Sequence, residues 1–171
     1  MTDETVASVM GAMKDFYIKG GNYKIDNEGN SMLWRLYINA DNKLYYKFFN
    51  SDVLVWDDAT IDQEKVTGTE LRTTNEKILG YDCNEVILHC NTGTWKYYFN
   101  TKLFIDSRLF SNCLIDSWYP YLLKANAVPL KIVNENADFI MESTAVAVKP
   151  MQLDKNMFAL PEGVKTKKSG L

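Results

Sequence analysis

The sequence has little of what several functional classes require. It has one histidine and three cysteines in 171 residues, and 19 Lys+Arg against 22 Asp+Glu leave a formal net charge of −3. No Lys/Arg stripe lies in the part expected to fold, which argues against a nucleic-acid partner. No apolar run reaches the roughly 18 residues that span a bilayer as a helix. We therefore expect no nucleic-acid partner and no membrane-spanning segment.

The sequence also lacks a catalytic signature. His89 is the sole histidine, and no G-x-S-x-G elbow accompanies it. Cys90 adjoins it, but adjacent strand residues point to opposite faces. The phosphate-binding loop and the dinucleotide fingerprint are absent. Glu85 and Glu142 would form a glycosidase pair only if they faced each other across a cleft. We predict no catalytic residue, no enzymatic activity and no cofactor.

No metal site has a recognisable spacing. The zinc patterns do not fit Cys83, His89, Cys90 and Cys113, and the aspartates within 57–62 lack the glycine of a calcium-binding loop. Two interpretations of the thiols stay open. One is a Cys83–Cys113 disulfide in an exported protein, and the other is buried free thiols that pack as small apolar groups.

The first 20 residues predict an amphipathic helix. Val6, Val9, Met10 and Met13 follow the i, i+3, i+4 pattern, and Gly20-Gly21 is expected to end the helix. The stretch has neither a basic n-region nor a continuous apolar core, so it is not a signal peptide. The expected location is cytoplasmic if the sequence is complete, and periplasm or cell envelope if an export signal was removed.

The rest of the chain predicts strands and short connections, and the length fits a single domain over 1–171. One helical turn is expected near Asp154–Met157, and 164–171 is expected to be a mobile tail. Residues 60–66 form either a short helix or an irregular crossing. Strands are expected at Tyr23–Ile25, Ser31–Ile38, Lys43–Phe49, Val53–Trp56, Gly68–Thr74, Val128–Val133 and Phe139–Val148.

A long hairpin over Lys77–Asp106 is expected to be the stretch around which the rest of the chain is arranged. Its loop is predicted as Asn91-Thr92-Gly93, with Gly93 at positive φ and Cys90 opposite Thr94. A two-residue loop would shift this register by one residue. The predicted pairing gathers an aromatic-rich face of Tyr81, Cys83, Ile87, Trp95, Tyr97 and Phe99.

Both faces of these strands carry large apolar side chains, so both need cover from a helix, a curled sheet or a ligand. An interlocked, filled core is the alternative to a ligand cavity. Arg35, within an aromatic strand, either reaches into such a cavity or lies at its rim. From strand parity, the candidate ligand-binding residues are Trp34, Leu36, Tyr46, Phe48, Trp95, Tyr97 and Phe99.

The stretch Ser107–Ala127 is apolar but irregular, and Pro120 argues against a continuous helix through it. One interpretation is that it packs over the sheet or closes a cavity. The other is that its 110–123 part is an exposed apolar surface for a partner protein.

Four stretches, in order, carry a resemblance to a known family. They are KILGYDC at 77–83, the tryptophan-bearing strand and Thr-Lys-Leu turn of 95–106, VPLK at 128–131 and LDKNMFALPEG at 153–163. Over roughly 73–165 the chain resembles an exported bacterial family of unknown function. That family is similar to the periplasmic lipoprotein carrier LolA and to outer-membrane lipoprotein-sorting proteins.

The resemblance implies an α+β, LolA-like fold. In such a fold a strongly curved antiparallel sheet forms an incomplete β-barrel, with an N-terminal helix and short helical segments on its concave side. It implies a non-enzymatic cell-envelope protein that binds a lipid acyl chain or another apolar small molecule in the half-barrel cavity. A further envelope protein is a possible partner, and no catalytic residues come with the family. The alternative function is a protein-interaction module with a filled core that uses 110–123.

Overall fold

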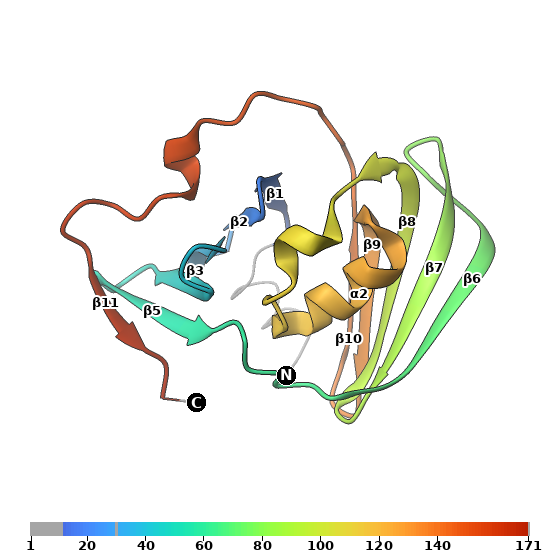
Figure 1. Cartoon of the computed structure of the whole chain (residues 1–171), viewed down its shortest axis with the longest axis horizontal. Coiled ribbons are helices and arrows are strands. Elements are labelled where there is room, and N and C mark those ends of the chain that lie inside the picture. Colours follow the sequence, from blue (N-terminus) through green and yellow to red (C-terminus); the bar gives the residue numbers. More distant parts are fainter. Residues whose placement is uncertain (1–11, 30, 171) are drawn as a thin grey trace. The chain divides into compact units, whose positions relative to one another are not determined.

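The computed structural model describes residues 12–29 and 31–170, and it divides the chain into two compact units. Unit 1 takes the described residues up to Thr60 and those from Gln152 onward, and unit 2 is Ile61–Met151. Each unit is built on one open sheet, sheet A in unit 1 and sheet B in unit 2 (Figure 1). The fold is therefore a sheet-dominated α+β fold. The single domain expected over 1–171 stays a prediction.

Sheet A has the strand order β1-β2-β3-β4-β5-β11. The first five strands form an antiparallel meander, and β11 joins β5 in parallel. The strands are β1 (Lys14–Lys19), β2 (Asn22–Asn27), β3 (Met32–Ile38), β4 (Lys43–Phe48), β5 (Val53–Asp58) and β11 (Lys165–Lys168). The four strands predicted between residues 23 and 56 are all present, with ends that differ by a few residues.

The helix predicted over 1–20 is corrected where the structure describes the chain. Residues 1–11 of that prediction lie outside the described residues, and Lys14–Lys19 is a strand paired with β2. Gly20 and Gly21, with φ of 57° and 83°, are the two residues between these strands. Two positive-φ residues match the twist of an antiparallel hairpin. The glycines therefore turn a hairpin instead of ending a helix.

The C-terminal segment contains a strand that the sequence did not predict. Lys165–Lys168, within the expected tail 164–171, pairs with Val53–Trp56 as strand β11. Its side chains are all exposed, so backbone pairing holds it in place. A strand held this way lacks the apolar alternation by which sequence patterns reveal strands.

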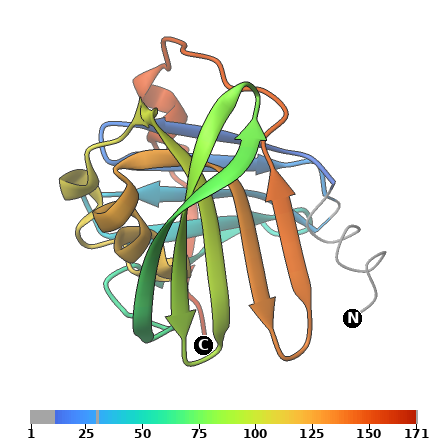
Figure 2. The same cartoon turned by 90° about the vertical axis from the view of Figure 1, so that its right-hand side faces the viewer.

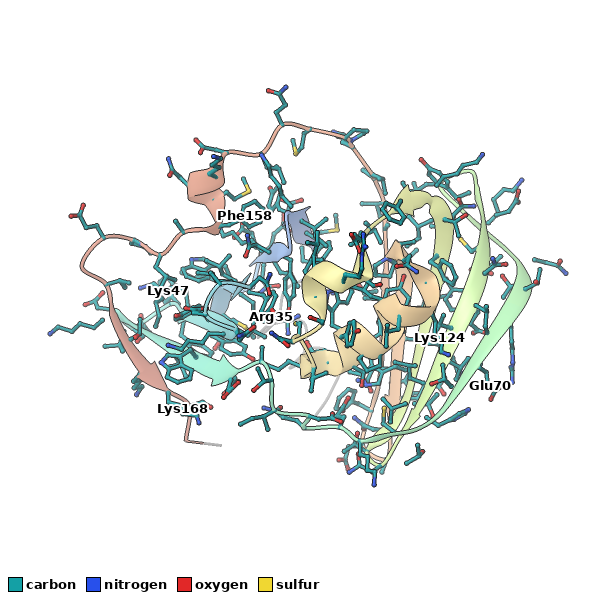
Figure 3. The ribbon with its side chains drawn as sticks, in the orientation of Figure 1. Arg35, Lys47, Glu70, Lys124, Phe158 and Lys168 are labelled. Carbon is teal, nitrogen blue, oxygen red and sulfur yellow. The ribbon has the colours of Figure 1, made fainter. Side chains whose placement is uncertain are left out.

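The segment before β11 covers one face of sheet A. It contains the predicted helical turn, η3 (Lys155–Phe158), whose N-cap Asp154 accepts a hydrogen bond from the Asn156 backbone N–H at 2.9 Å. Phe158, labelled in Figure 3, packs in one buried cluster with Leu36, Tyr45 and Leu54. This cluster supplies the cover that the apolar strands were expected to need.

Sheet B is an antiparallel meander with the order β10-β9-β8-β7-β6. Figure 2 shows these strands side by side in that order. They are β6 (Val66–Ile78), β7 (Tyr81–Cys90), β8 (Gly93–Phe104), β9 (Ala127–Asn136) and β10 (Ile140–Thr144). Leu79 and Gly80, both at positive φ, turn β6 into β7. The ILGY stretch is therefore a hairpin turn.

Between β8 and β9 the chain forms three short helical elements on one side of sheet B (Figure 1). They are η1 (Ser107–Phe110), η2 (Ile115–Ser117) and α2 (Trp118–Ala125). Pro120 was expected to argue against a continuous helix through Ser107–Ala127, and the stretch is divided into these three elements. Pro120 itself lies in the first turn of α2, where backbone N–H groups have no helical partner. Among the described residues no helix is long and apolar enough to cross a bilayer.

The register of the β7–β8 hairpin differs from the predicted one by a single residue. His89 pairs with Thr94 and Leu88 with Trp95, so the loop is Asn91-Thr92. Opposed residues share a face, so Trp95, Tyr97 and Phe99 lie with Leu88 and Val86 instead of Ile87. The predicted face grouping is therefore wrong, although the hairpin itself is present.

Gly93 has a different role from the predicted one. It does not have a positive φ, and a Cβ built on it would lie 2.3 Å from the backbone oxygen of Glu135. Gly93 is paired with Asn136 on β9, so the missing side chain allows β8 and β9 to approach each other there.

We expect Gly93→Ala to lower the free energy of unfolding by about 1–3 kcal/mol, because the new methyl group meets backbone that cannot move cheaply. Gly68→Ala is the matched control, since its nearest neighbour would be His89 Cδ2 at an ordinary 3.4 Å. Urea unfolding followed by circular dichroism measures both. Equal stability of the two variants would contradict this role of Gly93.

Candidate functional site

The register of sheet B separates charged from uncharged side chains. One face, which we call the inner face, carries two rows that cross all five strands without a charged residue. They are Thr69, Leu88, Trp95, Asn134, Met141 and Leu71, Val86, Tyr97, Ile132, Ser143. The opposite, outer face carries Gly68, His89, Thr94, Glu135, Ile140; Glu70, Ile87, Lys96, Val133, Glu142; and Arg72, Glu85, Tyr98, Lys131, Thr144.

An aromatic stack lies on the inner face. Trp95 and Tyr97 are stacked with ring centroids 5.9 Å apart, and Tyr97 stacks on Tyr121 of α2 at 4.2 Å. Phe99 meets Tyr121 edge-on at 6.3 Å. Each such pair contributes about 0.5–1.5 kcal/mol beyond the area it buries. Trp95, Tyr97 and Phe99 are all buried, so α2 fills the space next to them.

Helix α2 presents a narrow apolar stripe to the sheet. Its buried residues are Trp118, Tyr121, Leu122 and Ala125, which follow the i, i+3, i+4, i+7 spacing. In Figure 3, Lys124 lies on α2, whereas Glu70 projects from β6 on the side away from α2. The helix therefore lies over the inner face and does not cover the outer face.

The ends of α2 are fixed by residues in unusual backbone conformations. Asp116 and Ser117 precede it with φ of 54° and 53°, and Asn126 follows it with φ of 44°. Left-handed conformations are unfavourable for most residues other than glycine, but Asn and Asp tolerate them, so the cost falls mainly on Ser117. The packing on sheet B compensates for this cost, so the position of this eight-residue helix depends on its contacts with the sheet.

Two buried tyrosines connect the helical segment to its surroundings. The Tyr97 hydroxyl donates to the backbone oxygen of Asp116 at 2.8 Å, and the Tyr121 hydroxyl donates to that of Ala127 at 2.8 Å. Burial, followed by the nearby Asp116, raises the pKa of Tyr97 well above its ordinary value. Burial likewise raises the pKa of Tyr121. Both hydroxyls therefore stay protonated and donate throughout the physiological range.

A carboxylate lies at one end of the aromatic stack. Glu64, in the connection before β6, accepts from Trp95 Nε1 at 2.6 Å and from Thr92 Oγ1 at 2.9 Å. The Asn91 backbone N–H donates to the oxygen of Lys65 at 3.1 Å, beside these contacts. The segment 60–66, expected to be either helical or irregular, is an irregular connection up to Val66 and positions Glu64 against the hairpin loop.

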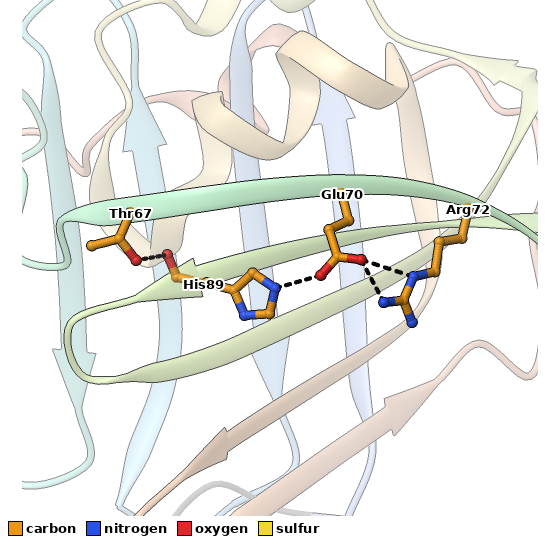
Figure 4. Close-up of polar contacts among 4 residues, drawn as sticks. All are labelled: Thr67, Glu70, Arg72 and His89. Carbon is orange, nitrogen blue, oxygen red and sulfur yellow. Dashed lines mark hydrogen bonds and ion pairs between the residues drawn. The ribbon is translucent and has the colours of Figure 1, made fainter.

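His89 lies on the outer face and forms a charged cluster with β6 (Figure 4). Its Nε2 is 2.7 Å from Glu70 Oε1, and Glu70 Oε2 accepts from Arg72 Nε at 3.0 Å. Thr67 Oγ1 donates to the backbone oxygen of His89 at 3.0 Å. Within the described residues the imidazole bonds to Glu70 alone, so the cluster is a cross-strand hydrogen-bond network without a nucleophile in contact.

A second polar network spans β7, β8, β9 and β10 on the same face. Lys131 Nζ is 3.3 Å from Glu142 Oε1 and 5.3 Å from the centre of the Tyr98 ring. Burial, and then a hydrogen bond to Glu85, raises the pKa of Tyr98 to about 12. Glu85 and Glu142 therefore take part in separate cross-strand contacts, and neither contact resembles a glycosidase pair across a cleft.

The structure distributes the seven predicted ligand-binding residues over three surfaces. Trp95, Tyr97 and Phe99 lie together on the inner face of sheet B. In unit 1, Trp34 and Leu36 belong to the cluster around Phe158. Tyr46 pairs with Arg35, and Phe48 follows Tyr46 on its face, so both lie on the opposite face of sheet A from Leu36. Unit 1 therefore does not gather its four candidates into one site.

The segment expected to be an exposed surface is mostly core. Within 110–123, the exceptions include Leu123, which is 52% exposed. The buried residues are Phe110, Cys113, Ile115, Trp118, Tyr121 and Leu122. This corrects the prediction of an exposed apolar patch there. The i, i+3, i+4, i+7 spacing in Trp118–Ala125 was the available signal for α2.

The cysteines are free thiols in the structure. Cys83 and Cys113 are buried, and Cys90 is half-buried with its sulfur 3.6 Å from Ser117 Oγ. Burial raises the pKa of both the Cys83 and the Cys90 thiols. These groups therefore pack as small apolar side chains. Across the described part of the chain, no three His, Cys, Asp or Glu residues are grouped to hold a metal.

Comparisons with known proteins give a fold and no function. No protein-family model matches the chain, and no curated protein matches it. A solved structure described as an uncharacterized conserved protein from Thermus thermophilus is similar over 91% of this chain and 81% of that one, with a TM-score of 0.52 and 9% identity. At this identity the similarity concerns the fold alone.

We expect the outer-face cluster to give the protein an acid-dependent loss of stability. Hydrogen bonds from His89 and then Arg72 hold the pKa of Glu70 below its ordinary value of 4.5. A carboxyl group with a depressed folded-state pKa stabilises the fold above its unfolded pKa, and this contribution is lost as the pH falls through the folded pKa. Between about pH 5 and about pH 3, the unfolding free energy should fall more for the wild type than for Glu70→Gln.

Urea titrations at several pH values measure this difference. Glu162→Gln removes an exposed carboxylate that has no ion pair among the described residues, and it should leave the pH dependence of the wild type unchanged. If Glu70→Gln and the wild type lose stability in parallel on acidification, the cluster does not stabilise the fold.

Proposed function

We propose that this protein is a non-enzymatic binding protein of the cell envelope that holds a lipid acyl chain or another apolar ligand. The proposed site is the inner face of sheet B, next to Trp95, Tyr97 and Phe99. The observation that carries the proposal is an uncharged aromatic sheet face whose cover consists of the eight-residue helix α2 and two short helical turns, η1 and η2. The resemblance to lipoprotein carriers is a second support, and it also motivates the envelope location.

The ligand would take the place of α2 on the sheet. Tyr97 and Tyr121 are in direct stacking contact at 4.2 Å, so an acyl chain lies between them only if the helix moves. The ligand would then bury the aromatic surface that α2 buries in its absence. This burial contributes about 25 cal/mol per Å² to the free energy of binding.

The polar groups agree with binding more than with catalysis. In the outer-face cluster, the Glu70 carboxylate accepts hydrogen bonds from both His89 and Arg72. On the inner face, Cys90 has a raised pKa, and the tyrosine hydroxyls donate to backbone oxygens. Neither arrangement supplies an activated nucleophile beside a base.

The first measurement is mass spectrometry of an organic extract of the natively purified protein. We expect a lipid or another apolar molecule in near-stoichiometric amount. A weakly held ligand is lost in purification, so the protein is also titrated with a monoacylglycerol that carries bromine atoms on its acyl chain. An empty extract together with no binding in the titration would overturn the proposal.

The same brominated lipid locates the site by quenching tryptophan fluorescence. We expect strong quenching in a variant that keeps only Trp95, made by Trp34→Phe, Trp56→Phe and Trp118→Phe. The control variant keeps only Trp56, which lies in unit 1 with Lys43 Nζ 4.2 Å and Lys168 Nζ 5.7 Å from its ring centre. Quenching of Trp56 without quenching of Trp95 would place the ligand elsewhere and contradict the proposed site.

A further inference from the structure

Strand β6 is a long edge strand, and it is the outermost strand of sheet B in Figure 1. It pairs with β7 and with no other described strand, and its 13 residues include no proline. Two other edge strands differ, because β10 has only five residues and β11 carries three lysines in four residues. Short length and lysines ordinarily keep the unpaired backbone groups of an edge from pairing with another chain.

The charges of β6 are complementary to those of a second, antiparallel copy. Register shifts interrupt its pairing with β7 on either side of 68–73, so this is its regular part. Two identical antiparallel strands are related by a twofold axis perpendicular to the sheet, at which one residue faces its own copy. With Leu71 on that axis, Glu70 of each copy lies opposite Arg72 of the other. An axis at Glu70 or at Arg72 would oppose like charges instead.

Leu71 is the exposed end of an otherwise buried row. Val86 and Tyr97 continue its row across the inner face and are 0% and 1% exposed, whereas Leu71 is 61% exposed. A second Leu71 opposite it would remove this apolar surface from water.

The two charged residues beside Leu71 can serve both copies at once. Arg72 Nε donates to Oε2 of Glu70 in the same chain at 3.0 Å, and both side chains are partly exposed. A guanidinium group has five N–H donors, so Arg72 retains donors for Glu70 of the second copy. Each charge then has an opposite charge beside it along its own strand and another across the axis.

We infer that β6 is a homodimer interface, at which a second copy of this chain pairs antiparallel about Leu71. The two five-stranded sheets then form one continuous sheet. A twofold axis perpendicular to the sheet leaves both inner faces on the same side. The regular stretch is short, so we expect dissociation in the micromolar range or above. This inference is independent of the proposed function.

Sedimentation velocity over about 1 µM to about 1 mM protein tests the association. We expect the sedimentation coefficient of the wild type to rise with concentration to that of a dimer. Leu71→Lys places like charges opposite each other on the axis and should weaken the association at least about tenfold. Ile140→Lys changes a 71% exposed apolar residue of β10, at the other edge of sheet B, and should retain the dimer. Circular dichroism verifies that both variants are folded.

Charge exchange tests the register. Glu70→Lys and Arg72→Glu each oppose like charges, so each variant alone should lose the dimer. An equal mixture of the two should form a heterodimer, because every opposed pair again joins a positive and a negative side chain. The double variant Glu70→Lys/Arg72→Glu restores this complementarity within one chain, and it should associate as the wild type does.

Three results would overturn the inference. One is a wild type that stays monomeric over the whole concentration range. Another is a dimer that Ile140→Lys disrupts and Leu71→Lys does not, because the interface then lies away from β6. The third is a folded double variant that stays monomeric, or an equal mixture without a heterodimer, because the register about Leu71 is then wrong. None of these results affects the proposed function.

Discussion

The pairing register of β7 with β8 is the constraint on which unit 2 depends. With Leu88 opposite Trp95, every charged residue of the central rows falls on the outer face of sheet B. A shift of one residue in β8 would carry Lys96 to the inner face and Tyr97 to the outer one. The two-residue loop fixes this register, and the close approach of Gly93 to the Glu135 backbone favours the register of β8 with β9.

Once the register is set, the inner face requires cover, and α2 provides it. The stripe from Trp118 to Ala125 matches the aromatic residues of β8, and the Tyr97–Tyr121 stack is its centre. The left-handed conformation of Ser117 is a cost that this packing offsets, whereas Asp116 and Asn126 belong to the residue types that tolerate it. Favourable packing and an unfavourable backbone conformation therefore act on the same short element.

Sequence patterns predicted most strands, because apolar alternation and turn residues mark them. These patterns gave wrong predictions where a helix and a strand, or two loop lengths, fitted the same residues equally well. Gly20-Gly21 suits both a helix end and a hairpin, and the second is correct. The β7–β8 loop was wrong by one residue, which moved Ile87 to the wrong face. Strand β11 leaves no apolar signal, and strand parity within one strand cannot show that Tyr46 and Leu36 lie on opposite faces of sheet A.

The candidate site was predictable only in its apolar part, since Trp95, Tyr97 and Phe99 alternate along one strand. Which side chains join them in the uncharged rows was not predictable, because only the register across β8, β9 and β10 assigns each neighbouring strand's residues to a face. The cover of this face was not predictable either, since the Tyr97–Tyr121 stack joins residues of two elements that the pattern of one strand does not relate. A shift of one residue in either pairing would mix charged and uncharged rows, so the separation of the two faces is a property of the register and not of any single strand.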